Sequence, residues 1–346
     1  AGATGRTGRL VVEELLARPG NVHVTALVRD GGKASEVLDA QSPRLRVVPG
    51  VDLTDAAALR EACADACAVV WCASGPPGGA PPSEPQNSNP LLAALLRPFG
   101  GLAPSSPSGA GAQGGDDEPF DARALRAIGE ASAASDTRVV CLSSAATTRP
   151  AWSDEAKKRY VGAADIPIVR LNPGGILDAK RRAEAALRSS HADVRYVVVR
   201  PTGLNDDWPR GRPVVSQGDL AVGRTCRKDV AALLADLALD THGAGTAAEG
   251  KTFEVLTLAG YAAPASLKPQ LDRLAPDEPD TDGRPSAQPL DAATLDATYA
   301  LLQQLVPGET LQPERLAMGQ TYEQLDANET GRLGERGQER VPASLS

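Results

Sequence analysis

The sequence predicts an α/β fold with a doubly wound, mainly parallel β-sheet. Apolar segments of strand length alternate along the chain with segments of helical periodicity, and the apolar segments are uninterrupted, as in strands buried on both faces. The clearest strand candidates are residues 22–28, 45–48, 68–73, 139–142, 197–199 and 252–255. The 346 residues, 42% of them apolar, suffice for one large α/β domain with additional segments, or for two modest domains.

The first nine residues, AGATGRTGR, place glycines at positions 2, 5 and 8. A segment of helical periodicity follows them, and then the predicted strand at residues 22–28. Dinucleotide-binding turns have this order. The glycines permit a tight turn and let the backbone approach the pyrophosphate closely, and the N-terminus of the helix attracts the pyrophosphate. The motif therefore predicts a Rossmann-type site whose cofactor contacts are Gly2, Thr4, Gly5, Arg6, Thr7 and Gly8.

A strand normally leads into such a glycine loop, and this sequence has none before it. We therefore expect the natural chain to continue upstream of Ala1 by at least one strand, together with any targeting peptide. The alternative is a degenerate Rossmann scaffold that binds no nucleotide, because its first strand is absent from the sequence.

The loop after residues 22–28 indicates which dinucleotide is preferred. Arg29 takes its first position, and with Arg6 it offers two guanidinium groups to the 2′-phosphate of NADP(H). Asp30 follows directly, and an acidic residue here suits the ribose hydroxyl of NAD instead. We predict NADP(H), the alternative being that Arg29 and Asp30 are only solvated loop charges. Asp52 is expected beside the adenine.

Three later segments resemble the NmrA-like branch of the atypical, or extended, short-chain dehydrogenase/reductase superfamily: VVCLSS at 139–144, VVVRPTG at 197–203 and RKDVA at 227–231. The resemblance covers residues 1–75 and 119–260. It implies a Rossmann domain in which Ser143 lines the active site and Pro201 lies beside the nicotinamide.

Within that branch, residues 174–180 (GGILDAK) are similar to chloroplast and cyanobacterial members. Those members are associated with photosystem assembly and maintenance rather than with a defined metabolic reaction. The resemblance therefore implies a chloroplast protein that acts in a larger, photosynthetic complex.

Catalysis in the superfamily depends on a Tyr-x-x-x-Lys pair, in which the lysine lowers the tyrosine pKa and holds the nicotinamide ribose. Lys180 fits the lysine, but Ile176 stands in the tyrosine position and cannot transfer a proton. Tyr160 would reach Lys180 only through an unusual loop. Three alternatives follow: Lys180 and Ser143 support a tyrosine-independent reduction, Lys180 only holds the cofactor, or Lys180 is an ordinary solvent-facing lysine.

Composition argues against other classes of function. The net charge is −8 and the basic residues are dispersed, which disfavours a nucleic-acid partner. No apolar run approaches the roughly 20 residues that span a bilayer. The three histidines lack ligand spacing, and the five cysteines are expected to be small buried hydrophobes, so we predict no metal site.

Two segments depart from the alternating pattern. Residues 76–118 are a Gly- and Pro-rich insertion in a domain that we predict over residues 1–261. Residues 262–346 are predicted to form a small C-terminal lobe, with an amphipathic helix at 290–305, and an extended polar tail. The insertion and the tail are the expected contacts with a complex. The leading hypothesis is a noncatalytic subunit or assembly factor that binds NADP(H), and the alternative is a soluble NADPH-dependent reductase that uses Lys180.

Overall fold

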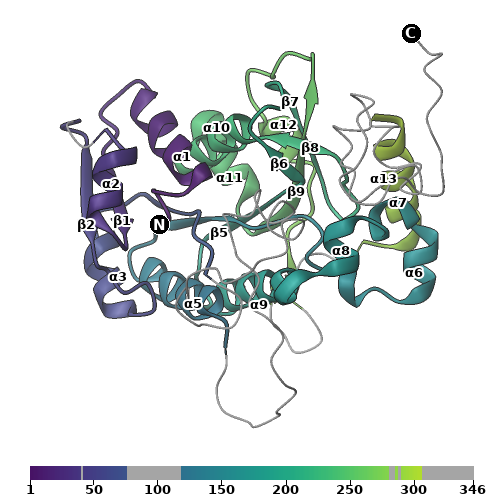
Figure 1. The fold of residues 1–346 in the computed structure, drawn as a ribbon, viewed down its shortest axis with the longest axis horizontal. Coiled ribbons are helices and arrows are strands. Elements are labelled where there is room, and N and C mark those ends of the chain that lie inside the picture. Colours follow the sequence, from purple (N-terminus) through teal and green to yellow (C-terminus); the bar gives the residue numbers. More distant parts are fainter. Residues whose placement is uncertain (40–41, 76–117, 280–284, 287–289, 306–346) are drawn as a thin grey trace, which may run out of the picture.

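A computed structural model of the chain describes residues 1–39, 42–75, 118–279, 285–286 and 290–305. It confirms the α/β fold. The main sheet has five strands in the order β3 (Ala68–Trp71), β4 (Arg138–Leu142), β5 (Tyr196–Pro201), β9 (Lys251–Ala259) and β7 (Gly211–Ser216). The first four are parallel, and β7 runs antiparallel to β9 at the edge (Figure 1).

A separate parallel pair, β1 (Val24–Val28) and β2 (Leu45–Pro49), lies beyond the β3 edge. Among the described residues it shares no backbone ladder with the main sheet. Ala1 lies along β3: its amino group donates to the Val70 carbonyl at 2.8 Å, and Cys72 N donates to the Ala1 carbonyl at 3.0 Å. The glycine loop therefore begins at the C-terminal end of β3.

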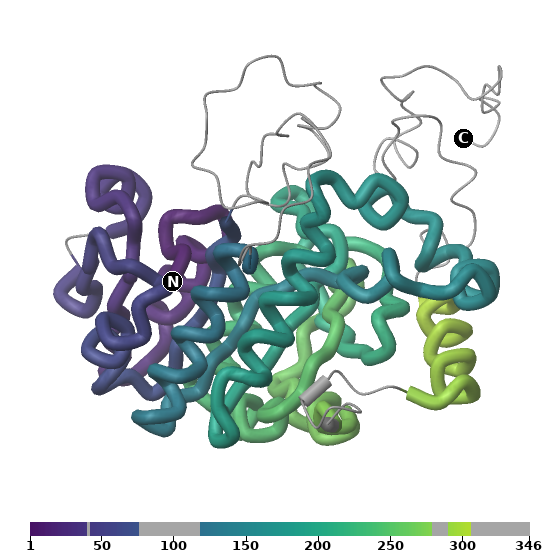
Figure 2. Tube along the Cα trace, turned by 90° about the horizontal axis from the view of Figure 1, so that it is seen from below, coloured from purple at the N-terminus to yellow at the C-terminus, as the bar shows by residue number. Residues whose placement is uncertain are grey.

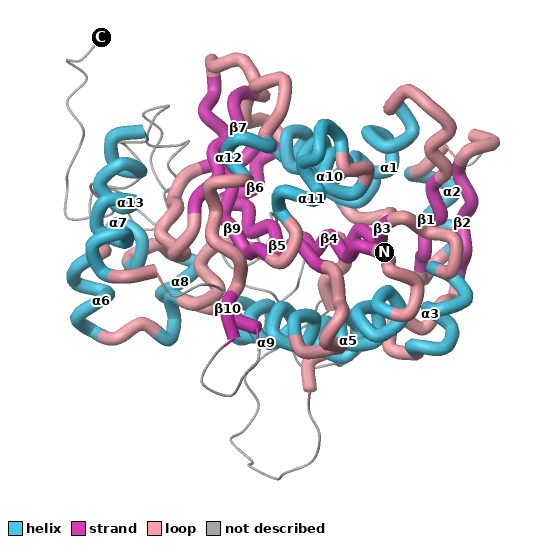
Figure 3. Tube along the Cα trace, turned by 180° about the vertical axis from the view of Figure 1, so that it is seen from behind, coloured by secondary structure: helices cyan, strands magenta, loops and turns pink. Residues whose placement is uncertain are grey.

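Helices cover both faces of the sheet, as a doubly wound fold requires (Figure 3). One layer contains α1 (Arg6–Ala17), α10 (Arg227–Ala238) and α11 (Ala244–Ala248), and the other contains α3 (Ala56–Cys63), α5 (Phe120–Ala133) and α9 (Ile176–Arg188). Successive residues of β4 alternate between these layers: Val140 packs with α1 and α10, whereas Val139 and Cys141 pack with α5 and α9.

Residues 141–175 and 203–225 contain short regular elements. Residues 203–225 include β7 and most of a parallel pair, β6 (Gly203–Asn205) and β8 (Arg224–Cys226). Residues 141–175 hold short helices: η2 (Arg149–Ala151), α6 (Asp154–Arg159), α7 (Val161–Ala164), α8 (Pro167–Leu171) and η3 (Pro173–Gly175). Prolines begin or flank several of these short elements, so periodicity in the sequence does not reveal them.

The predicted C-terminal helix is confirmed as α13 (Ala292–Leu305). Tyr299 and Leu302 are buried against α7 and the 220–222 segment, whereas Leu305 is exposed. The remaining short elements are α2 (Gly31–Val37), η4 (Thr241–Gly243), α12 (Lys268–Leu271), β10 (Glu278–Pro279) and β11 (Pro285–Ser286). Most of the predicted insertion (76–117) and the last part of the tail (306–346) lie outside the described residues.

The cysteines are free thiols in the structure. Cys63, Cys141 and Cys226 are buried as expected, but Cys67 is exposed, because α3 ends at Cys63 and does not carry Cys67 onto its packed face. Burial raises the pKa of Cys72 to about 11, so that thiol stays protonated near neutral pH.

Candidate functional site

Glycines 2 and 8 are required by the geometry of the loop. Gly2 has φ +81°, and a Cβ there would lie 2.5 Å from Ala73 N. A Cβ on Gly8 would overlap the carbonyl oxygen of Gly2. Gly5 N donates to that same carbonyl at 3.0 Å and closes the turn. The loop therefore packs directly against the residues that follow β3.

The first turn of α1 faces the loop without a protein cap. Gly5 is the N-cap residue and supplies no side-chain hydrogen bond, and the turn contains no acidic residue. The first N–H groups of a helix have no intrahelical partner and carry a partial positive charge, which makes them an anion site. Thr4 is half-buried, Arg6 is exposed and Thr7 is buried at this position. This arrangement fits the pyrophosphate of a dinucleotide.

The other predicted cofactor residues come from the same edge of the sheets. Parallel strands bring their carboxyl ends together, and this edge is where ligands bind in doubly wound folds. The residues that end or follow strands there are Arg29 after β1, Asp52 after β2, Ser74 after β3, Ser143 after β4 and Pro201 at the end of β5. Ser74 was not among our predicted site residues, because a lone serine after a strand carries no distinct signal.

Asp30 has a structural role that the sequence left open. Its Oδ1 accepts hydrogen bonds from Gly32 N at 2.8 Å and Lys33 N at 3.3 Å, so it is the N-cap of α2. Arg29, beside it, is exposed. Asp52 is exposed and accepts from Thr54 Oγ1 and Thr54 N, and these hydrogen bonds lower the pKa of Asp52 and keep it ionised.

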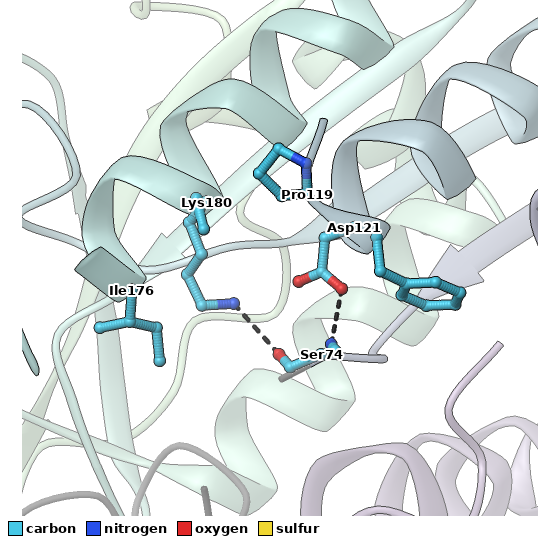
Figure 4. Close-up of a pocket in the computed structure, with 8 residues that line it drawn as sticks. Ser74, Pro119, Asp121, Ile176 and Lys180 are labelled. Carbon is cyan, nitrogen blue, oxygen red and sulfur yellow. Dashed lines mark hydrogen bonds between the residues drawn. The ribbon is translucent and has the colours of Figure 1, made fainter. Parts of the chain in front are cut away.

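Lys180 lies inside the protein, on the sheet-facing side of α9. It is 9% exposed, and its Nζ donates to Ser74 Oγ at 3.2 Å (Figure 4). The alternative of a solvent-facing lysine is therefore wrong; Arg181 and Arg182 are the exposed residues of this run. Since Ser74 directly follows the residue against which Gly2 packs, Lys180 lies close to the glycine loop.

Asp121, at the start of α5, is a carboxylate that lines the same hollow as this lysine (Figure 4). It is 8% exposed and accepts a hydrogen bond from Gly75 N at 2.6 Å. Burial raises the pKa of Asp121, while the charge of Lys180 opposes that shift. Our sequence analysis missed Asp121, since it follows directly on the insertion and belongs to no motif.

The tyrosine position is apolar in the structure as in the sequence. Ile176 is 4% exposed, begins α9 and packs with Ala146, Val169 and Leu177. Tyr160 does not replace it, because its hydroxyl is hydrogen-bonded to Asp296 at 3.0 Å and its ring packs on Tyr299. That tyrosine therefore belongs to the contact with α13.

Ser143 is buried and donates its hydroxyl to Glu184 Oε1 at 2.5 Å. Glu184 also accepts from Arg200 Nε at 3.0 Å and Arg188 Nη2 at 3.0 Å. Burial by itself would raise the pKa of Glu184, but the two arginines and Ser143 together lower it to about 2. Ser143 thus helps to hold a buried carboxylate that is ionised at neutral pH.

Two small hollows adjoin these side chains. One is lined by Ser74, Ile176 and Lys180, the other by Ser143, Glu184 and Lys180, and Asp121 contributes to both. Each has a volume of about 10 Å³, which is room for at most one water molecule. The fold therefore brings the two predicted catalytic residues, Lys180 and Ser143, to one place, but leaves little space there.

Comparison with known proteins agrees with this geometry. The sequence profile of a family described as NAD(P)H-binding matches residues 2–241. The chain belongs to this NAD(P)H-binding family. No curated protein matches the chain. The oxidoreductase ylbE from Lactococcus lactis is 14% identical, with a TM-score of 0.51 over 79% of this chain and 93% of its own, and shows the same fold.

Two other solved structures are similar to this NAD(P)H-binding protein. A wide-type short-chain dehydrogenase/reductase from Veillonella parvula, in complex with NADP, is 15% identical (TM-score 0.48; 77% of this chain and 96% of its own). The triphenylmethane reductase from Citrobacter sp., complexed with NADP(H), is 16% identical (TM-score 0.39; 90% of each chain).

No group of three or more metal-ligating side chains that could hold an ion occurs within the residues that the structure describes. None of the helices in that part of the chain has both the length and the apolar character needed to cross a membrane.

Proposed function

We propose that this protein binds NADP(H), in preference to NAD(H), along the carboxyl edge of its strands. The uncapped first turn of α1, placed behind a loop that only glycine can form at positions 2 and 8, carries this proposal. The pyrophosphate binds there. Lys180 donates to Ser74, the residue that follows the segment on which Gly2 packs, and holds the nicotinamide ribose.

The preference for NADP(H) is supported by the loop after β1. Arg29 is exposed at its first position, and Arg6 lies in the first turn of α1. The carboxylate of Asp30, which would favour NAD, is used by two backbone N–H groups of α2. A loop with an exposed arginine whose acidic neighbour is already a helix cap suits a 2′-phosphate better than a ribose hydroxyl.

The role that we propose for the bound nucleotide is noncatalytic. Ile176 supplies no proton, and the Ser143 hydroxyl is donated to Glu184. We infer a subunit or an assembly or stability factor of a photosynthetic or other organellar complex, contacted through the insertion and the tail. The chloroplast location and that complex rest on the similarity of residues 174–180 to chloroplast and cyanobacterial proteins.

The second candidate is an NADPH-dependent reductase, and the burial of Lys180 beside Asp121 favours it. The nicotinamide, when bound, would supply a hydride to a carbonyl carbon. Lys180 Nζ would then give its proton to the carbonyl oxygen, so that an alcohol forms and the lysine is left neutral. Asp121 lines the same hollow as Lys180, so its charge would stabilise the ammonium before the transfer, and the lysine would then regain its proton from solvent.

The two functions are tested first by titrating the full-length protein with NADPH and with NADH. Arg29→Ala should weaken NADPH binding about tenfold to a hundredfold, the loss expected for one or two charge-assisted hydrogen bonds, and leave NADH binding unchanged. Arg46→Ala, which removes an exposed arginine from β2, is the matched control. Equal affinity for both nucleotides would contradict the NADP(H) preference, and no binding would identify the fold as a scaffold.

Activity is tested next, with the NADPH-loaded protein and a panel of aldehydes, ketones and imines. The noncatalytic role predicts that absorbance at the NADPH band stays constant, and that Lys180→Ala changes only the affinity for NADPH. Oxidation of NADPH that Lys180→Ala abolishes, while the variant still binds the nucleotide, would establish the reductase instead.

A further inference from the structure

At the start of α1, two residues of the glycine motif, Arg6 and Thr7, contact two side chains from elsewhere in the fold, Asp206 and Arg227. Arg6 forms an ion pair with one oxygen of Asp206. Arg227 donates through Nε to the other oxygen at 2.5 Å, and through Nη1 to Thr7 Oγ1 at 2.9 Å. One carboxylate thus joins two arginines at the place where the pyrophosphate should bind.

The small β6–β8 pair explains how residues 21 positions apart meet here. These strands are parallel, with Asn205 opposite Cys226. Asp206 and Arg227 are the next residues of the two strands, so both leave the pair at the same end. Arg227 also begins α10, which packs side by side with α1 (Figure 1). The fold therefore holds the Arg227 guanidinium against the first turn of α1.

Arg227 is a buried cation that its neighbours satisfy only in part. It is 2% exposed, and its Nη2 is buried with no hydrogen-bond partner among the described residues. Burial lowers the pKa of Arg227, and nearby Arg9 adds to that shift. A buried guanidinium nitrogen without an acceptor is costly, and is expected where a second anion completes its hydrogen bonds.

We propose that the Asp206 carboxylate is an internal competitor of the cofactor: it occupies Arg6 and Arg227 in the unliganded protein, and the pyrophosphate of NADP(H) displaces it and binds Arg227. The inference rests on the proposed function, because it describes regulation of the same nucleotide site. A pyrophosphate carries more negative charge and more acceptor oxygens than a carboxylate, and arginine pairs with phosphate in the same geometry. Nη2 then gains the acceptor that it lacks.

An internal competitor multiplies the apparent association constant of the ligand by the fraction of molecules in which the competitor leaves the site free. Removing its charge must therefore increase affinity. Asp206→Asn should tighten NADPH binding about tenfold, within the range of ordinary coupling energies. Arg227→Gln should weaken NADPH binding about tenfold or more, because the phosphate loses its buried partner.

The matched control is Asp207→Asn. Asp207 is the next residue, is exposed and has no ion pair among the described contacts, so the substitution makes the same change in net charge on the same loop. Binding is measured by calorimetry for NADPH and, as a fragment without any phosphate, for adenosine. The proposal expects Asp206→Asn to tighten only NADPH, with Asp207→Asn equal to the wild type for both ligands.

Each result decides between the two claims. If the wild type binds NADPH and neither Asp206→Asn nor Asp207→Asn changes that affinity, the internal competitor is overturned and the proposed function stands. Absence of NADPH binding in the wild type and both variants would overturn both claims. NADPH binding that appears only in Asp206→Asn would support the competitor in its strongest form. Because Asp206 is partly exposed, its variant tests the proposal even if Arg227→Gln does not fold.

Discussion

Gly2 is the position at which a single methyl group should do most damage to the nucleotide site. Its φ of +81° is strained for other residues, and a Cβ would lie 2.5 Å from Ala73 N. Gly2→Ala must therefore displace the loop and is expected to abolish NADPH binding and to lower the free energy of unfolding. Urea denaturation and nucleotide titration of the same samples measure both effects.

Gly20→Ala is the control for backbone strain alone. Gly20 has φ +99°, and nothing lies within 4 Å of the position that its Cβ would take. The substitution should cost about 1–2 kcal/mol of stability, as a left-handed residue does, and leave NADPH affinity unchanged. If Gly2→Ala behaved in the same way, close packing of the loop on Ala73 would not be what requires the glycine.

Glu184 should be a principal source of stability at neutral pH. It is buried with Arg200 and Arg188, and its pKa of about 2 lies below the ordinary value of 4.5. A carboxylate with a lowered folded-state pKa stabilises fully above about pH 4.5, and this stabilisation is lost as the pH falls toward 2. Glu184→Gln removes the charge that pairs with the buried Arg200, while Arg188 keeps its ion pair with Asp277, and should cost about 3–5 kcal/mol at pH 7.

The pH dependence separates this effect from a packing defect. The difference in unfolding free energy between wild type and Glu184→Gln should be full at pH 7 and smaller at pH 3, as urea titrations at the two values would report. Glu36→Gln, on the exposed side of α2, should differ from the wild type at neither pH. A difference that stayed constant between pH 7 and pH 3 would show that the charge of Glu184 is not its cause.

At the scale of elements, α2 gives Asp30 a structural role that the sequence alone did not determine. Asp30 caps this seven-residue helix, as Asp55 caps α3 with the same two hydrogen bonds. Asp30→Ala should therefore cost about 1 kcal/mol of stability, and Asp55→Ala a similar amount. Neither should change the ratio of NADPH to NADH affinity. A rise in NADPH selectivity in Asp30→Ala alone would mean that its carboxylate acts on the cofactor.

The elements that the sequence predicted are those whose signal is local. Strands buried on both faces, such as β4 and β5, appear as uninterrupted apolar runs, and the glycine motif marks its own turn. β7 was missed because it is an edge strand that contains Pro213, which only an edge position tolerates. Likewise, Lys180 was predicted from its motif, whereas Asp121 meets it only through the packing of α5 on α9.

The residues around the site that could not be predicted share one property: their partners are distant in sequence. Ser143 and Glu184 are 41 residues apart, and Asp206 lies 200 residues from Arg6. Charge pairs of this kind follow from strand order and register, which depend on the whole chain. A single sequence therefore indicates the side chains that carry the chemistry. It does not indicate which distant residues form hydrogen bonds or ion pairs with them.

Across the whole molecule, the cofactor site and the C-terminal lobe lie at opposite ends. The glycine loop, β1 and β2 form one end, and α13 packs on the short helices α6 and α7 at the other (Figure 2). Tyr299 anchors α13: it is 9% exposed, its ring packs edge-on against Tyr160, and its hydroxyl accepts a hydrogen bond from Gly162 N at 3.0 Å. This separation makes stability and binding independently testable.

Tyr299→Ala should detach α13 and lower the free energy of unfolding by about 3–5 kcal/mol, as truncation of a buried aromatic does. Tyr299→Phe keeps the ring and loses only the hydrogen bond, at a cost of about 1 kcal/mol. Since the site lies at the far end, both variants should keep the wild-type affinity for NADPH, measured below their unfolding transitions. Weaker NADPH binding in Tyr299→Ala, with Tyr299→Phe unaffected, would instead mean that the C-terminal lobe and the nucleotide site are coupled through the sheet.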